Sequence, residues 1–175
     1  MRSRTAIWFE CKVRYEKVMK NGLQKKVTEQ YVVDALSFSE AEKRITEEMS
    51  AYISGELATP TSDATQDSSS ELGSPSLLRQ FEVTDVKKAQ YKEVFFDDES
   101  DRWYKAKLAF ITIDEKTEKE KRSNVTYLVQ AATLDGAVKN INEVMDGTMI
   151  DYEKSNIAET KVIDVFEHQE VKSEE

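Results

Sequence analysis

The sequence has few of the residues from which most catalytic and metal sites are built. Its 175 residues include one cysteine, Cys11, and one histidine, His168. A single cysteine excludes a disulfide within the chain and is typical of a reducing compartment. No His/Cys cluster has metal-ligand spacing, no Ser-His-Asp or Cys-His set is present, and five glycines leave little to cradle a phosphate. We therefore expect no cofactor and no enzymatic activity.

Long apolar runs and an excess of positive charge are also missing. No stretch of about 18 apolar residues occurs, so we expect no membrane-spanning helix. The first residues lack the apolar core of a signal peptide, which together with the single cysteine favours the cytoplasm. The net charge of −9 argues against a surface that binds nucleic acid everywhere.

A repeat is the main positive feature. The segment from Tyr31 to Met49 returns, without gaps, as Tyr127 to Met145, and eight of nineteen positions are identical. The identical pairs are Tyr31/Tyr127, Val33/Val129, Ala35/Ala131, Ala41/Ala137, Lys43/Lys139, Ile45/Ile141, Glu47/Glu143 and Met49/Met145. Such self-similarity predicts an internal duplication.

The patterns around the repeat predict an α+β fold with antiparallel sheet, made of two β-β-α-β units related by approximate two-fold symmetry. Period-two alternation predicts a strand from Ile7 to Met19, and Asn21-Gly22 predicts a turn, with a bulge or longer loop. We place the first unit at residues 1–54 plus 79–96 and the second at 102–167. Residues 55–78, which are rich in Ser and Thr, are expected to form a flexible loop, and 168–175 a disordered tail.

Within each unit the helix start and the last strand are also predicted. Ser37 and Glu40 have the spacing of a capping box, whereas Thr133 is followed by Gly136, so the second box is incomplete. The apolar stripe of the second helix extends to Met149, and Gly55 is expected to stop the first helix. The stretch 161–166 resembles 82–87, so we expect it to be the last strand of the second unit.

Two basic hairpins are the candidate contact surfaces. Residues 8–27 carry six basic and two acidic residues, and 102–123 carry seven and four. Alternation places Trp8 and Trp103 opposite the apolar rows, where exposed rings could stack on bases while lysines contact phosphates. The alternative is that the tryptophans pack between the two halves and that the lysines only discourage edge-to-edge aggregation. The residues concerned are Trp8, Lys12, Arg14, Lys25, Lys26, Trp103, Lys105 and Lys107.

Other polar groups have simpler explanations. Cys11 falls on the apolar face of its strand and is expected to be a core residue, as is its counterpart Ala106. His168 is expected to be solvated because it lies in the tail. The acidic connector at 97–101 lacks the spacing and glycine of a calcium-binding loop, so we interpret it as a solvated loop.

The run WFECKVRYEKVMKNGLQKKVTEQYVVDALSFSEAE, residues 8–42, resembles an uncharacterised family, a domain of unknown function of Bacteroides-type gut bacteria and their phages. The resemblance implies a bacterial or phage protein and supplies no activity or site residues. The leading hypothesis is a non-catalytic binding module that contacts a protein partner or a second copy, without a membrane. The alternative is a nucleic-acid-binding protein that uses the basic hairpins, with single strands as its candidate target.

Overall fold

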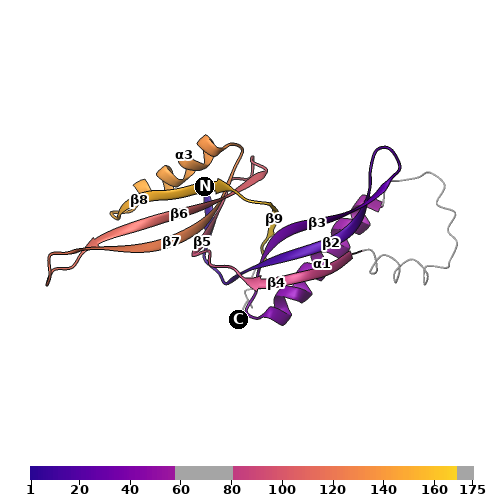
Figure 1. Ribbon diagram of the computed structural model, residues 1–175, viewed down its shortest axis with the longest axis horizontal. Coiled ribbons are helices and arrows are strands. Elements are labelled where there is room, and N and C mark those ends of the chain that lie inside the picture. The colour runs from indigo at the N-terminus through magenta and orange to yellow at the C-terminus, as the bar shows by residue number, and fades with distance from the viewer. Residues whose placement is uncertain (58–80, 169–175) are drawn as a thin grey trace, which may run out of the picture. The chain divides into compact units, whose positions relative to one another are not determined.

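The computed structural model describes residues 1–57 and 81–168, with no side-chain description for 53–57. The chain divides into two compact units. Unit 1 comprises Met1–Trp8 and Ala89–Asp164, and unit 2 comprises Phe9–Lys88 and Val165–Glu175. Within the described residues, each unit holds one sheet and one helix (Figure 1). The mixed α+β class predicted from the sequence is confirmed.

Unit 2 is built on the first basic hairpin. Strands β2 (Trp8–Val18) and β3 (Gln24–Asp34) are joined by residues 19–23, the longer loop that the apolar pattern predicted, with Gly22 at φ 80°. Helix α1 (Phe38–Leu57) follows, and β4 (Phe81–Lys88) then pairs antiparallel with β2. With β9 (Val162–Phe166) beside β3, the sheet order is β4-β2-β3-β9.

Unit 1 has the same succession of elements on the second hairpin. Strands β6 (Arg102–Ile113) and β7 (Glu120–Ala131) pair antiparallel, α3 (Leu134–Asp146) follows, and β8 (Asp151–Glu159) pairs antiparallel with β6. Beyond β7 lie β5 (Glu93–Phe96), which is parallel to β7, and β1 (Arg2–Arg4). The sheet order is β1-β5-β7-β6-β8.

Both cores form where the apolar rows of a sheet meet the stripe of its helix. In unit 2, Cys11, Val13 and Tyr15 pack with Ala41, Ile45 and Met49. In unit 1, Ala106 and Leu108 pack with Ile141 and Met145. Six of the eight identical pairs of the repeat are buried in both copies, namely Tyr31/Tyr127, Val33/Val129, Ala35/Ala131, Ala41/Ala137, Ile45/Ile141 and Met49/Met145.

The helix starts follow the local sequence. The Ser37 hydroxyl accepts a hydrogen bond from the Glu40 amide at 3.1 Å, and the Glu40 carboxylate accepts one from the Leu36 amide at 3.4 Å. The Thr133 hydroxyl caps α3 alone, accepting from the Gly136 amide at 3.0 Å. A Cβ on Gly136 would lie 3.2 Å from that hydroxyl, so glycine permits the close approach.

The structure differs from the sequence-based expectation mainly in its short strands. The last strand of the second β-β-α-β succession is β8, not 161–166, which forms β9 in the sheet of unit 2. Residues 93–96 were expected to belong to the N-terminal β-β-α-β unit, residues 1–54 plus 79–96. They instead form β5 beside β7, in the sheet of the second β-β-α-β succession. An apolar pattern indicates that a strand is buried but not which sheet it joins, and the mostly exposed β8 has no such pattern.

Smaller differences concern helix ends and the residues expected to be irregular. Helix α1 continues past Gly55 to Leu57, and α3 ends before Met149, whose side chain is fully exposed. The remainder of the expected loop, 58–78, and the tail residues 169–175 lie outside the described residues.

Candidate binding surface

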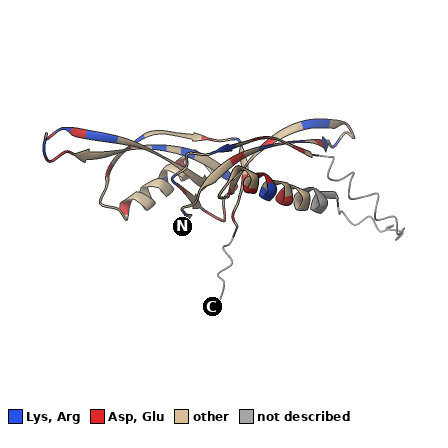
Figure 2. Cartoon of the chain, turned by 90° about the horizontal axis from the view of Figure 1, so that it is seen from below, with Lys and Arg blue, Asp and Glu red and all other residues tan. Residues whose placement is uncertain are grey.

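Each sheet has one face against its helix and a second face, here called the far face. Because side chains alternate along a strand, the residues between core positions point to the far face. In unit 2, Lys12 and Arg14 therefore lie on the far face, and in unit 1 Lys105 and Lys107 do so. All four of these side chains are exposed. Figure 2 shows residues of both signs of charge along the strands.

The basic residues on the far face of unit 2 have acidic neighbours on β4. Lys12 is the cross-strand partner of Asp85, and Arg14 that of Glu82, with 3.3 Å between the guanidinium and the carboxylate. Next to them, the Lys87 ammonium lies 3.5 Å from the Glu10 carboxylate. Directly opposed unlike charges stabilise strand pairs modestly. The positive charge of this face is therefore largely compensated within the unit.

The far-face lysines of unit 1, Lys105 and Lys107, have neutral cross-strand neighbours. Lys105 lies between Leu128 on β7 and Ala158 on β8, and Lys107 lies between Thr126 and Asn156. Neither ammonium group forms an ion pair within the described part of the chain. The far face of unit 1 thus presents two uncompensated positive charges on adjacent outward positions of one strand.

A bulge fixes the correspondence between the two units. The register shifts between Lys12 and Val13 in unit 2, and between Lys107 and Leu108 in unit 1. The extra residue on the outer strand is Thr84 in β4 and Ser155 in β8, a hydroxyl residue in both cases. The residue after the extra one faces the lysine of the central strand: it is Asp85 opposite Lys12 in unit 2 and Asn156 opposite Lys107 in unit 1. A single exchange of amide for carboxylate therefore distinguishes the surroundings of the two equivalent lysines.

A hollow of about 740 Å³ lies at Lys107 in unit 1. Its other lining residues come from β7, β8 and the segment before β5, namely Gln90, Tyr91, Lys92, Asn124, Val125, Thr126 and Ser155. The Lys92 ammonium lies over the Phe110 ring, 5.5 Å from its centroid. Among the residues that the structure describes, no acidic residue lines the hollow.

The remaining residues selected from the sequence behave differently. Lys25 and Lys26 are exposed at the start of β3 in unit 2. Trp8 and Trp103 are only 1% and 2% exposed, which contradicts the hypothesis of exposed rings that stack on bases and agrees with the alternative that the rings are packed. The alternation of side chains along the strands correctly placed both tryptophans opposite the apolar rows, but both rings are buried there. Phe96 of β5 packs edge-on against Trp103 with ring centroids 5.5 Å apart, a contact between residues separated by a loop.

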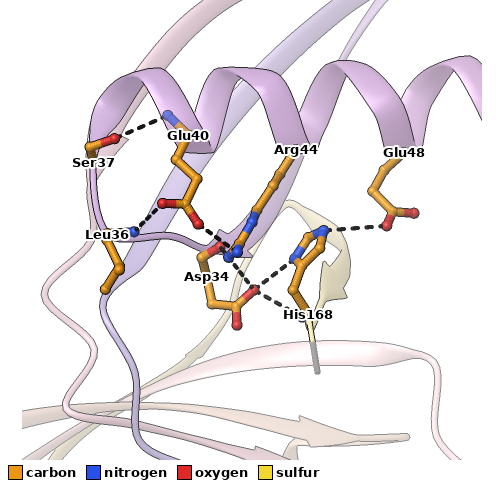
Figure 3. A network of polar contacts seen from close by, with 7 residues as sticks. All are labelled: Asp34, Leu36, Ser37, Glu40, Arg44, Glu48 and His168. Atoms are coloured by element: carbon orange, nitrogen blue, oxygen red, sulfur yellow. Dashed lines mark hydrogen bonds and ion pairs between the residues drawn. The ribbon is translucent and has the colours of Figure 1, made fainter. Parts of the chain in front are cut away.

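The most connected polar cluster was missed from the sequence. His168, expected to be solvated, donates its backbone amide to the Asp34 carboxylate at 3.0 Å, and its ring Nδ1 lies 2.8 Å from the same oxygen (Figure 3). The Arg44 guanidinium reaches the Asp34 carboxylate at 3.5 Å, donates to its backbone carbonyl and pairs with Glu40. The signal was Asp34 itself, a carboxylate between two buried residues that therefore needed partners.

The geometry of this cluster indicates a structural clasp. The second ring nitrogen of His168, Nε2, faces the Glu48 carboxylate at 3.6 Å, so the ring lies between two carboxylates (Figure 3). Unit 1 has an uncharged equivalent. Gln130, at the position of Asp34, accepts from the Asp97 amide at 3.0 Å and donates to the Ser100 carbonyl at 2.7 Å, while Asn140 donates to the Gln130 carbonyl.

Three further groups bear on function. Cys11 is fully buried, and burial followed by the charges of Asp85 and Glu10 raises the pKa of its thiol to about 12. The described residues contain no grouping of three His, Cys, Asp or Glu side chains suited to hold a metal ion. Across the same residues, no helix combines the length and apolar character needed to cross a membrane.

The fold defines an α+β protein with two sheets, each covered by one helix. The family model described as Domain of unknown function (DUF4494) matches residues 7–66 and 57–168. The chain belongs to this family, in agreement with the resemblance seen in residues 8–42. No curated protein matches the chain. No solved structure matches it either.

Proposed function

We propose that this protein is a non-catalytic binding module that holds an acidic segment of a protein partner on the far face of unit 1. The observation that carries the proposal is the pair Lys105 and Lys107, which have only neutral cross-strand neighbours. Lys12, the equivalent of Lys107 in unit 2, is opposed by Asp85, and the equivalent of Lys105 is Glu10, which pairs with Lys87. The far face of unit 2 pairs its charges internally, whereas Lys105 and Lys107 of unit 1 have no charged partner across the strands. This difference supports a role for the two lysines in recognising a partner of negative charge.

Protection of a sheet edge does not account for these lysines. Lysine on an exposed edge strand discourages pairing between molecules. However, β6 lies between β7 and β8, so Lys105 and Lys107 are on an interior strand. The edge strand β8 is interrupted by the bulge at Ser155, which itself hinders the addition of a further strand. Binding through the face is therefore better supported than pairing at the edge.

An acidic protein segment is favoured over nucleic acid for two reasons. The tryptophans that would have stacked on bases are buried, which removes the sequence-tolerant part of single-strand binding. The net charge of −9 repels a long polyanion, whereas a short acidic segment needs only the local positive face. Lys105 and Lys107 still provide phosphate contacts, so nucleic acid is the second outcome of the test.

The proposal includes an origin for the two units. We infer that one ancestral β-β-α-β unit was duplicated. The repeated order of elements, the equivalent bulges and the shared core positions support this inference. A cytoplasmic setting in a Bacteroides-type bacterium or phage is also part of the proposal. It rests on the sequence resemblance and the single cysteine.

The test is fluorescence anisotropy with a labelled glutamate-rich peptide and with single- and double-stranded oligonucleotides, each at low and moderate salt. We expect the peptide to bind and the double variant Lys105→Glu/Lys107→Glu to lose binding. The matched control, Lys12→Glu/Lys26→Glu, removes the same charge from unit 2 and should retain it. Preferential oligonucleotide binding with a steep salt dependence would replace the proposal with the second hypothesis. No binding of either probe at low salt would contradict both.

A further inference from the structure

The hollow at Lys107 has the composition of a site for a compact anion. Lys107 supplies an ammonium group, Thr126 and Ser155 supply hydroxyls, and Asn124 supplies an amide. All four side-chain types donate hydrogen bonds, and three are neutral, so none repels a negative charge. The lining contains no carboxylate that would compete for the ammonium.

An acidic residue on the same face, Glu153, is already paired. Glu153 lies opposite Ala109 on β6, two positions from Lys107. Its carboxylate accepts two hydrogen bonds from the Arg122 guanidinium, at 2.9 and 3.3 Å. A bidentate arginine pair holds a carboxylate in a defined orientation. Glu153 is therefore held by Arg122 and leaves the Lys107 ammonium available to a ligand.

The comparison across the bulge singles out Asn156. In unit 2 the lysine at the equivalent position faces Asp85. An aspartate at position 156 would place a negative charge across from Lys107 and oppose an incoming anion, whereas asparagine adds a further donor beside it. Asparagine at position 156, in place of an aspartate, therefore allows the site of unit 1 to bind an anion.

We propose that this hollow binds a single phosphate group carried by a phosphorylated side chain of the acidic partner. The proposal rests on the function proposed above, because the hollow lies on the same far face. Several donors around one cation suit a tetrahedral oxyanion, which offers more acceptor oxygens than a carboxylate and twice its charge. Lys92 also lines the hollow, while its ammonium lies over the Phe110 ring on the helix-covered side of the sheet.

The experiment is an NMR titration of the ¹⁵N-labelled full chain with a phosphoserine peptide, its unphosphorylated counterpart and inorganic phosphate. We expect the phosphopeptide to shift the signals of Thr126, Ser155 and the Asn124 side chain. It should bind about tenfold more tightly than the unphosphorylated peptide, the effect of one charge-assisted hydrogen-bonded group. Inorganic phosphate should shift the same signals more weakly, which separates the anion from the peptide that carries it.

Two variants with matched controls test the assigned residues. Lys107→Gln and Asn156→Asp should each abolish the preference for the phosphopeptide. Lys12→Gln, at the equivalent position of unit 2, should leave the preference unchanged. Asn21→Asp is the control for the added carboxylate, because it lies in the β2–β3 loop and keeps its acceptor for the Leu23 amide. Circular dichroism establishes that each variant is folded.

The outcomes separate this inference from the proposed function. Equal affinity for the two peptides, with shifts at Lys105 and Lys107, would overturn the phosphate site and leave the acidic-segment module intact. Phosphate-dependent shifts that persist in both Lys107→Gln and Asn156→Asp would also overturn the site. Binding of inorganic phosphate in the hollow without binding of either peptide would support the anion site and contradict the module.

Discussion

The two units share a plan and differ in how their polar residues are used. Unit 2 joins its charges internally: Arg14 pairs with Glu82, Lys12 faces Asp85, and Asp34 is tied to His168 and Arg44. Unit 1 makes the equivalent clasp from neutral groups, Gln130 and Asn140, and leaves the two lysines of β6 uncompensated. Similar cores can therefore carry one face whose charges serve the fold and another whose charges are available to a partner.

The strongest test of the shared plan is truncation of the equivalent core isoleucines. Ile45 and Ile141 are both fully buried at the same turn of their helices. Changing either residue to alanine should lower the free energy of unfolding by about 4 kcal/mol, through lost burial and the cavity left behind. Urea unfolding followed by circular dichroism measures both losses. A loss at one position several times that at the other would contradict equivalent packing.

The clasps provide the next largest effect and should differ between the units. Asp34→Ala removes the carboxylate that accepts from the His168 amide and pairs with the His168 ring and the Arg44 guanidinium, which should cost about 3 kcal/mol. Gln130→Ala breaks only neutral hydrogen bonds and should cost about 1 kcal/mol. The same unfolding measurements distinguish these values. Equal losses would mean that the ionic clasp is no stronger than the neutral one.

A smaller effect on stability is expected at Cys11, because the equivalent position of unit 1 is already an alanine. Cys11 is fully buried at the position that alanine, Ala106, occupies in unit 1. Cys11→Ala should therefore cost only about 1 kcal/mol. Because its thiol pKa is raised to about 12, the native protein should resist alkylation at mildly alkaline pH, where unfolded chains react readily. Rapid labelling of the native protein would show that this strand opens easily.

The repeat and its core were predictable because burial imposes periodicity on the sequence. Tyr31, Ala41 and Ile45 recur as Tyr127, Ala137 and Ile141 at helix and strand spacing, and the structure buries all of them. The capping of α1 by Ser37 and of α3 by Thr133 depends on adjacent residues, and it was also predicted correctly.

What the sequence could not reveal depends on contacts between distant segments. Strands β5 and β9 carry apolar residues, but the sheets they join are set by tertiary pairing. The burial of Trp103 against Phe96 and the bond between His168 and Asp34, 134 residues apart, have the same origin. The lysines of the candidate surface were found from their alternation. Which of these lysines lies opposite a carboxylate and which does not became known only from the register of β4 on β2 and of β8 on β6.

The difference between the far faces is tested most directly by mapping where an acidic ligand binds. Titration of the ¹⁵N-labelled chain with the glutamate-rich peptide should shift backbone signals around Lys105, Lys107 and Thr126 of unit 1. Signals around Lys12 and Arg14, whose charges are opposed by β4, should remain in place. Shifts of equal size in both units, or shifts confined to unit 2, would contradict the account.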